Sequence, residues 1–128
     1  MTRLALYGSL RRGQPAYRRL GLDRALRFAG PCEISGALHD FGDWPGLVAG
    51  DGHVAGELYE VVQRGALAKL DAYEACNPAR PAKGLFIRRE VTLVSPARMR
   101  AMVYVFNRDT GDAPLIESGD WLRHLKER

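Results

Sequence analysis

Alternation of hydrophobic and polar residues, together with β-branched and aromatic content, marks five short segments of the chain and predicts a protein built mainly from β-strands. The five segments span residues 4–7, 33–38, 53–61, 86–94 and 101–106. Helical signals are fewer: one segment opens at Pro15 and runs through Tyr17 and Leu20, and others span residues 64–75 and 121–125. The pattern therefore predicts a strand-dominated α+β fold in which the strands form a sheet or a small barrel.

Three segments rich in glycine and proline separate these elements, at residues 42–52, 77–84 and 109–114. We interpret them as surface loops and not as domain boundaries, because further element signals resume after each one. A chain of 128 residues with 46% hydrophobic and 27% charged side chains falls in the range of ordinary globular domains. Residues 1–128 are therefore expected to form a single domain.

The chain shows no pattern typical of a targeting segment or a metal site. No apolar run approaches the roughly 18 residues of a membrane span, and no signal-peptide hydrophobic region follows the first residues. A cytoplasmic location is the expectation. Cys32, Cys76 and the three histidines lack the spacing of metal ligands, so we expect neither a metal nor a cofactor.

Positive charge is concentrated near the beginning of the sequence. The formal net charge is +4, and residues 1–30 contain seven arginines but only one acidic residue, Asp23. Such a segment can meet a nucleic acid, a membrane surface or an acidic small molecule. Because aromatic residues other than Tyr17 do not interleave with these arginines, nucleic acid is the less favoured of these partners.

The first candidate site follows the first predicted strand, at Tyr7, Gly8, Ser9 and Leu10. A glycine and a small hydroxyl residue there allow a turn whose backbone amides can point at a ligand oxygen. The simpler alternative is that Gly8 only makes a tight turn. Gly8 and Gly13 have the spacing of the glycines in a phosphate-binding P-loop, but the Lys and Ser/Thr of that motif are absent. Nor does Ser9 lie in the Gly-x-Ser-x-Gly motif of a serine nucleophile.

The second candidate is Glu74, in the predicted helix at residues 64–75. Helical spacing places Glu74 on one face with Leu67 and Leu70. Asn77 and Pro78 end the helix just beyond, so Glu74 falls in its last turn, where burial and the helix dipole both raise the pKa of a carboxyl group. We expect either a general base or a glutamate whose stem packs while its carboxylate reaches water. Trp44 lies in the predicted loop at residues 42–52. Its side chain is expected either to line a pocket or to cover the hydrophobic core.

The order of several motifs resembles the gamma-glutamylcyclotransferase-like family, in particular its gamma-glutamylamine cyclotransferase branch. The resemblance spans nearly the whole chain. Its motifs are Leu6-Tyr7-Gly8-Ser9-Leu10-Arg11-Arg12-Gly13, Trp44-Pro45-Gly46-Leu47, Val54-Ala55-Gly56-Glu57-Leu58-Tyr59, Leu70-Asp71-Ala72-Tyr73-Glu74, Phe86-Ile87-Arg88-Arg89-Glu90-Val91, Val103-Tyr104-Val105 and Ser118-Gly119-Asp120-Trp121. Two positions depart from the family: Phe86 stands in place of a tyrosine, and Ala75 follows Glu74 where glycine is frequent.

The resemblance implies a small mixed β-barrel or strongly twisted sheet flanked by short helices, with a pocket between the Tyr-Gly-Ser-Leu turn and the helix glutamate. It also implies a reaction in which the α-amine of a γ-glutamyl amine or peptide attacks its own side-chain amide and releases 5-oxoproline. Glu74 would serve as general base and acid, and the amides of Gly8, Ser9 and Leu10 would hold oxygens. Nearby arginines would attract the acidic substrate.

Two alternatives remain beside the enzyme: a catalytically silent small-molecule binding module of the same fold, and a nucleic-acid-binding barrel.

Overall fold

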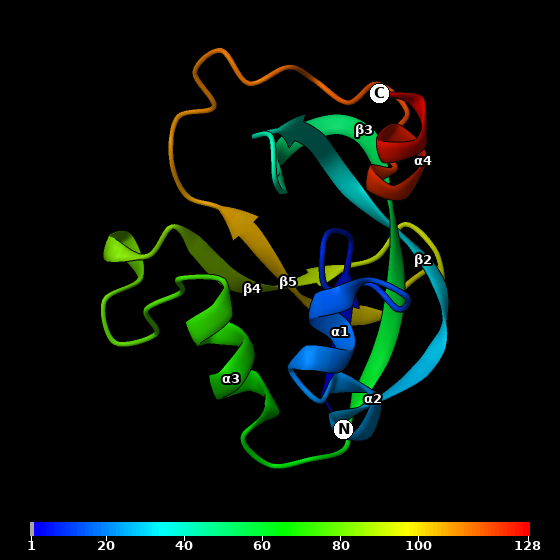
Figure 1. Cartoon of the computed structure of the whole chain (residues 1–128), viewed down its shortest axis with the longest axis vertical. Helices are drawn as coiled ribbons and strands as arrows, with labels where there is room; N and C mark the ends of the chain where they lie inside the picture. Colours follow the sequence, from blue (N-terminus) through cyan, green and yellow to red (C-terminus); the bar gives the residue numbers. More distant parts are fainter. Residues whose placement is uncertain (1) are drawn as a thin grey trace.

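The computed structural model describes residues 2–128 and contains one five-stranded sheet (Figure 1). The order of the strands across the sheet is β2-β3-β1-β5-β4. Strand β1 pairs in parallel with β5, and the other neighbouring strands pair antiparallel. The strands are β1 (Arg3–Leu6), β2 (Leu26–Asp40), β3 (Pro45–Val61), β4 (Phe86–Thr92) and β5 (Arg100–Phe106). The α+β class and the strongly twisted sheet are thus confirmed.

Short helices flank this sheet, as the sequence pattern predicts. They are α1 (Pro15–Arg19), α2 (Leu22–Ala25), α3 (Ala66–Tyr73) and α4 (Trp121–Glu127), with one turn of 3₁₀ helix at Pro81–Lys83. Helix α2 is the one element that the periodicity analysis misses, because its four residues are too few to show a helical period. Within residues 2–128, no helix is long and apolar enough to span a membrane.

The prediction of a surface loop at residues 42–52 is wrong for most of that segment. Strand β3 begins at Pro45, and β2 extends to Asp40, so the two strands form one long antiparallel hairpin. The glycines there reflect close packing: a Cβ atom on Gly46 would lie 2.7 Å from the Phe41 ring. A glycine that admits a neighbouring side chain and a glycine that makes a turn look the same in the sequence.

The barrel alternative is also wrong, because the sheet does not close. In the described residues, the edge strands β2 and β4 do not pair along their lengths. The segment after β4 reaches β2 through a bridge between Ser95 and Glu33, where the Glu33 amide donates to the Ser95 carbonyl at 2.8 Å, and the segment after β5 reaches β2 through a bridge between Leu115 and His39. The sheet is therefore strongly curved, and isolated bridges take the place of a closing strand pair.

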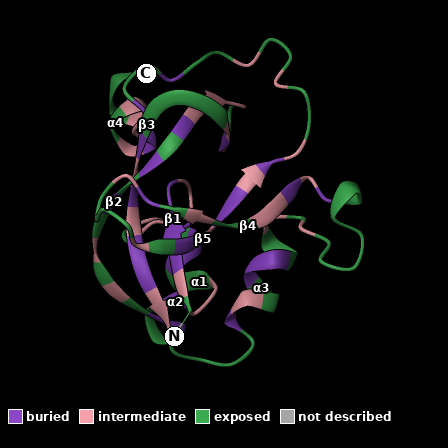
Figure 2. Ribbon diagram, turned by 180° about the vertical axis from the view of Figure 1, so that it is seen from behind, coloured by how far each residue is buried: buried purple, intermediate pink, exposed green. Residues whose placement is uncertain are grey.

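Strand β1 lies at the centre of the sheet and is buried on both faces. Leu4 and Leu6 pack into one hydrophobic cluster, whereas Ala5 and Tyr7 pack into another on the opposite face. Helices α1, α2 and α3 contribute to the first cluster, and Trp121 of α4 contributes to the second. Figure 2 shows buried residues concentrated along the strands and exposed residues in the outer loops. The first candidate segment, residues 7–10, directly follows this central strand, which therefore fixes its position.

Candidate active site

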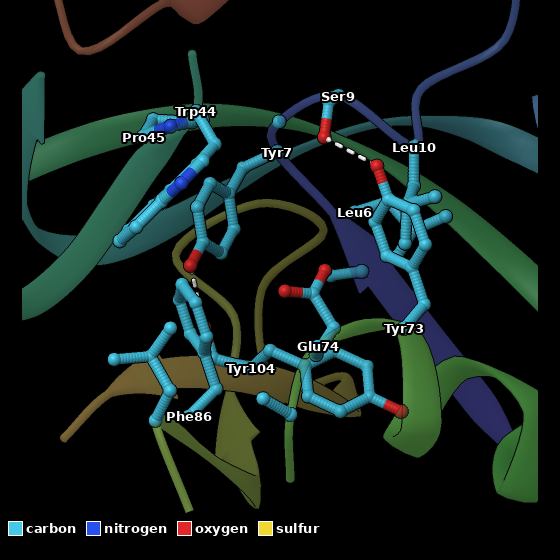
Figure 3. A pocket seen from close by; sticks show the side chains of 14 residues that line it. Leu6, Tyr7, Ser9, Leu10, Trp44, Pro45, Tyr73, Glu74, Phe86 and Tyr104 are labelled. Carbon is cyan, nitrogen blue, oxygen red and sulfur yellow. Dashed lines mark hydrogen bonds between the residues drawn. The ribbon is translucent and has the colours of Figure 1, made fainter. Parts of the chain in front are cut away.

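A cavity of about 180 Å³ lies between the end of β1 and the end of α3 (Figure 3). It brings together all five residues singled out in the sequence, although Tyr7–Leu10 and Glu74 are more than 60 positions apart. Its volume is below the roughly 300–1,000 Å³ of pockets for drug-sized ligands, so it fits a small molecule or one end of a larger one. The lining residues are Ala5, Leu6, Tyr7, Gly8, Ser9, Leu10, Trp44, Pro45, Tyr73, Glu74, Ala75, Leu85, Phe86 and Tyr104.

The loop after β1 forms a tight turn at the cavity. The Arg11 amide donates to the Gly8 carbonyl at 3.1 Å, which places Ser9 and Leu10 at the two central positions. Within residues 2–128, no acceptor receives a hydrogen bond from the amides of Gly8, Ser9 or Leu10. Three consecutive backbone donors therefore lack a partner in the described residues, and their role in holding a ligand stays a prediction.

Gly8 is required by a close contact and not by an unusual backbone conformation. A Cβ atom at this position would lie 2.9 Å from Cγ and 3.2 Å from Cδ of Pro45. Strand β3 begins at Pro45, so the absence of a side chain lets the loop approach the hairpin closely. The Gly8–Pro45 contact thereby fixes one wall of the cavity.

Tyr7 supplies a fixed wall of the cavity. Its buried hydroxyl donates to the Tyr104 carbonyl at 2.6 Å and accepts from the Leu47 amide at 3.2 Å. Burial, reinforced by the nearby Glu74 carboxylate, raises the pKa of Tyr7 far above its ordinary value. Tyr7 therefore stays protonated and joins β1, β5 and β3.

Glu74 follows the last residue of α3, and its carboxylate points into the cavity (Figure 3). Its amide donates to the Leu70 carbonyl at 2.9 Å, which keeps the residue in helical register. No residue in the described part of the chain donates a hydrogen bond to its carboxylate. Burial alone raises the pKa of Glu74 to about 7. A carboxyl group with this pKa can take up and return a proton near neutral pH.

The backbone changes direction directly after Glu74. The Cys76 amide donates to the Asp71 carbonyl at 2.8 Å and the Ala75 amide to the Ala72 carbonyl at 3.3 Å, the two bonds of a Schellman motif. Ala75 occupies the left-handed position of this motif at φ 51°, which glycine adopts more readily. The departure at Ala75 thus leaves the helix end in place but puts an unfavourable conformation beside Glu74.

A second carboxylate, Asp71, lies one turn before Glu74 and is 6% exposed. It accepts two hydrogen bonds from Arg88, at 2.9 and 3.1 Å, and one from the Tyr104 hydroxyl at 2.7 Å. The sequence analysis does not single out Asp71. Its signal is present, however, because Asp71 continues the stripe of Leu67, Leu70 and Glu74 by helical spacing.

The side chains of Arg11 and Arg12 do not line the cavity, so their attraction of an acidic substrate would act over a distance and stays a prediction. Arg11 forms ion pairs with Asp120 at 3.1 Å and, through Nε, with Glu57 at 3.7 Å; the Nε atom has no hydrogen-bond partner in the described residues. The Arg12 guanidinium lies 3.6 Å from the centre of the Phe28 ring. Both side chains are occupied in holding the loop against its neighbours.

Trp44 walls the cavity, which settles the alternative left open by the sequence. It is partly exposed and packs with Phe41, Phe86 and Phe106. Phe86, which replaces the family tyrosine, is buried and brings no hydroxyl to the lining. Within residues 2–128, no three His, Cys, Asp or Glu side chains are grouped so as to hold a metal ion.

Residues 4–123 match the family described as gamma-glutamyl cyclotransferase, AIG2-like. The gamma-glutamylcyclotransferase family protein YtfP of Escherichia coli K12 is 38% identical over 85 residues, which span 66% of each chain, just under two thirds. The gamma-L-glutamyl-butirosin B gamma-glutamyl cyclotransferase of Niallia circulans is 32% identical over 126 residues, 97% of this chain and 78% of that protein.

Solved structures show the same fold. An uncharacterized protein from Pyrococcus horikoshii superposes with a TM-score of 0.74 at 24% identity, covering 99% of this chain and 95% of that one. An AIG2-like protein from Mus musculus superposes with a TM-score of 0.69 at 27% identity, covering 91% of this chain and 86% of that one. With a family match that extends over nearly all of its residues, the chain belongs to the AIG2-like gamma-glutamyl cyclotransferase family.

Proposed function

We propose that this protein is a cyclotransferase that converts a γ-glutamyl amine or peptide into 5-oxoproline and the free amine. The observation that carries the proposal is the Glu74 carboxylate, which faces the cavity without a hydrogen-bond partner in the described residues and with a pKa raised to about 7. The unpaired amides of the loop after β1 supply the complementary donors. Family membership supports this type of reaction.

The nucleophile in this reaction is the α-amine of the substrate. Glu74 accepts a proton from the α-ammonium, and the freed nitrogen attacks the γ-carbonyl carbon to close a five-membered ring. Glu74 then returns the proton to the leaving nitrogen as the bond between that nitrogen and the γ-carbon breaks. The attacking nitrogen gives up its second proton to the released amine, so that the products are the lactam N–H of 5-oxoproline and the ammonium form of the amine. The reaction needs positioning and proton transfer, and it consumes no cofactor.

The oxygens of the substrate would be held by backbone groups. No Lys or Arg side chain lines the cavity, so the amides of Gly8, Ser9 and Leu10 are the donors for the α-carboxylate or for the negative carbonyl oxygen of the transition state. The fixed ring of Tyr7 and the Gly8–Pro45 contact keep this loop in place. A rigid loop avoids the cost of reorganising donors during the reaction.

The test is the release of 5-oxoproline from γ-glutamyl dipeptides, γ-glutamyl amines and glutathione. We expect release by the wild-type protein and a loss of about 10²- to 10⁴-fold in kcat for Glu74→Gln, which keeps the shape of the side chain but cannot accept the proton. The control is Glu117→Gln, a change at an exposed glutamate outside this cavity, which should retain kcat.

The alternative is a binding module of the same fold without turnover. Binding of a γ-glutamyl amide without 5-oxoproline release would favour that module, and unchanged release by Glu74→Gln would contradict the mechanism. Because Glu74 must be ionised to act as base, kcat/KM should rise with pH through about 7. A profile that is flat between pH 5 and 8 would contradict this role.

A further inference from the structure

We infer that the cavity contains a separate apolar subsite around Trp44, Leu85 and Phe86, which binds an uncharged aromatic or branched apolar group on the leaving amine. The inference rests on the proposed function and specifies its substrate class. It excludes leaving amines that carry a carboxylate near the reacting nitrogen, as in γ-glutamyl dipeptides.

The indole of Trp44 is held in a fixed orientation by three other aromatic rings. Its ring centre lies 4.7 Å from that of Phe41 in a stacked arrangement, and 5.6 Å and 5.7 Å from those of Phe86 and Phe106. Yet Trp44 is partly exposed and lines the cavity. The cluster therefore presents a preformed aromatic face at the cavity wall, and a preformed face loses little freedom when a ligand binds.

The aromatic face at Trp44 lies on one side of Glu74, and this position indicates that it contacts the leaving amine of the substrate. In Figure 3, Glu74 lies between Trp44 and Phe86 on one side and Leu10 and Tyr73 on the other. The bond that breaks must lie at Glu74, and the turn that carries Leu10 offers the free amides for the α-carboxylate. The leaving amine then extends to the opposite side.

Part of the lining on that side reaches solvent. Leu85 and Trp44 are partly exposed, whereas Phe86 is buried. A leaving amine longer than the cavity can therefore project outward over the indole and the leucine side chain, while the reacting bond stays at Glu74.

The charges of the lining favour an uncharged group. Glu74 is the one acidic side chain in the lining, and no basic side chain is present there. The nearest cation along β4, Arg88, is bound by Asp71. A carboxylate placed against Trp44 and Phe86 would exchange most of its hydration for at most the single indole N–H of Trp44, and it would be repelled by ionised Glu74.

The test uses three amides that differ only in the leaving group: γ-glutamyl-benzylamide, γ-glutamyl-methylamide and γ-glutamyl-(α-carboxybenzyl)amide, whose carboxylate is on the carbon bonded to the reacting nitrogen. For the wild-type protein, kcat/KM for the benzylamide should exceed that for the methylamide by at least about tenfold, because a ring gains apolar contacts that a methyl group cannot make. The carboxybenzyl compound should fall at least about tenfold below the benzylamide. Equal or faster turnover of the carboxybenzyl compound overturns the inference.

Variants at Trp44 test whether the preference for the benzylamide over the methylamide depends on this side chain. The ratio of kcat/KM for benzylamide to methylamide should fall toward one in Trp44→Ala and be largely kept in Trp44→Phe, which retains a ring. Leu115→Ala is the matched control, because Leu115 is an exposed apolar residue outside this cavity, and its ratio should equal that of the wild type. If Trp44→Ala does not fold, the wild-type series and Trp44→Phe still decide the question.

The results that would contradict the apolar subsite differ from those that would contradict the proposed reaction. Release of 5-oxoproline from all three amides at equal kcat/KM would leave the reaction standing and remove the subsite. If no amide is turned over, the dissociation constants of the three amides, measured by calorimetry, should still follow the order benzyl, methyl, carboxybenzyl, from tightest to weakest. Any other order of binding overturns the subsite as well.

Discussion

Asp71 and Glu74 are two carboxylates one helical turn apart, and their surroundings differ almost completely. Asp71 is nearly inaccessible and receives hydrogen bonds from Arg88 and Tyr104. Glu74 faces a cavity, and no described residue donates to its carboxylate. The two carboxyl groups differ in their partners: Asp71 accepts charge-assisted hydrogen bonds, whereas Glu74 accepts none from the described residues, and burial raises the pKa of Glu74 to about 7. One carboxylate is thus suited to structure and the other to proton transfer.

The largest effect that we expect on stability comes from removing the charge of Asp71. Asp71→Asn leaves the Arg88 guanidinium without its ion pair, and removing one partner of a buried pair costs about 3–5 kcal/mol of unfolding free energy. Urea unfolding measures this loss. Glu60→Gln breaks the exposed ion pair with Arg27 and should cost less than about 1 kcal/mol. Equal losses in the two variants would contradict the structural role of Asp71.

Glu74→Gln should have the opposite effect on stability, and only above a certain pH. The pKa of Glu74 is about 7 in the folded protein and about 4.5 in the unfolded chain, so the folded state binds the proton more tightly. Below pH 4.5 both states are protonated; as pH rises to 7 the unfolded state ionises first, and the free energy of unfolding falls.

A glutamine at position 74 does not ionise, so the variant does not lose unfolding free energy in this way as the pH rises. Unfolding in urea at several pH values should therefore show Glu74→Gln equal to the wild type at pH 4 and more stable by about 1–3 kcal/mol at pH 8. A constant difference between the variant and the wild type across this range would mean that Glu74 is not titrating in the folded protein.

The cavity that leaves Glu74 without a partner depends on its opposite wall, where Gly8 meets Pro45. Gly8→Ala places a methyl group within 2.9 Å of the proline ring and should cost about 1–3 kcal/mol, since overpacking forces the backbone to move. Ser9→Ala, in the same turn, loses only a long contact of 3.4 Å with the Tyr73 hydroxyl and should cost less than about 0.5 kcal/mol. Thermal unfolding compares the two, and equal melting temperatures would contradict the steric explanation.

The smallest expected change concerns the residue after Glu74. Ala75→Gly relieves the left-handed conformation at φ 51° and should stabilise the protein by about 0.5–1 kcal/mol. The control is Ala72→Gly, an exposed position inside α3, where glycine should instead cost up to about 1 kcal/mol. Opposite signs in thermal unfolding would confirm that the helix ends at Glu74, whereas two losses would contradict it.

The sequence predicts the acid–base candidate but not the residue that supports it. Glu74 is found because helical spacing puts a carboxylate beside Leu67 and Leu70. The partners of Asp71 lie 17 and 33 residues away on two other strands, and no local pattern reveals that they converge. Pairing across the fold depends on how the sheet twists, which short-range periodicity does not encode.

The limits of fold prediction have a similar physical origin. Strand β1 is recognised from its continuous apolar residues because it is buried on both faces. The first part of β3 is missed because glycines at Gly46 and Gly50 pack against neighbouring chain segments. The bridge between Ser95 and Glu33 joins the segment after β4 to β2, and Ser95 lies outside the predicted strands, so the sequence pattern does not reveal this contact.

One carboxylate oxygen of Asp120 connects the start of α4 to the loop after β1. Oδ1 of Asp120 accepts from the Leu122 and Arg123 amides at the start of α4, and also from Arg11 at 3.1 Å. Local unwinding of the carboxyl-terminal helix would release this acceptor from its place and leave Arg11 with only its longer contact to Glu57. A tag or fusion partner that unwinds α4 would therefore loosen Arg11, which follows the turn at residues 8–10, and a long flexible spacer after Arg128 is the appropriate design for such attachments.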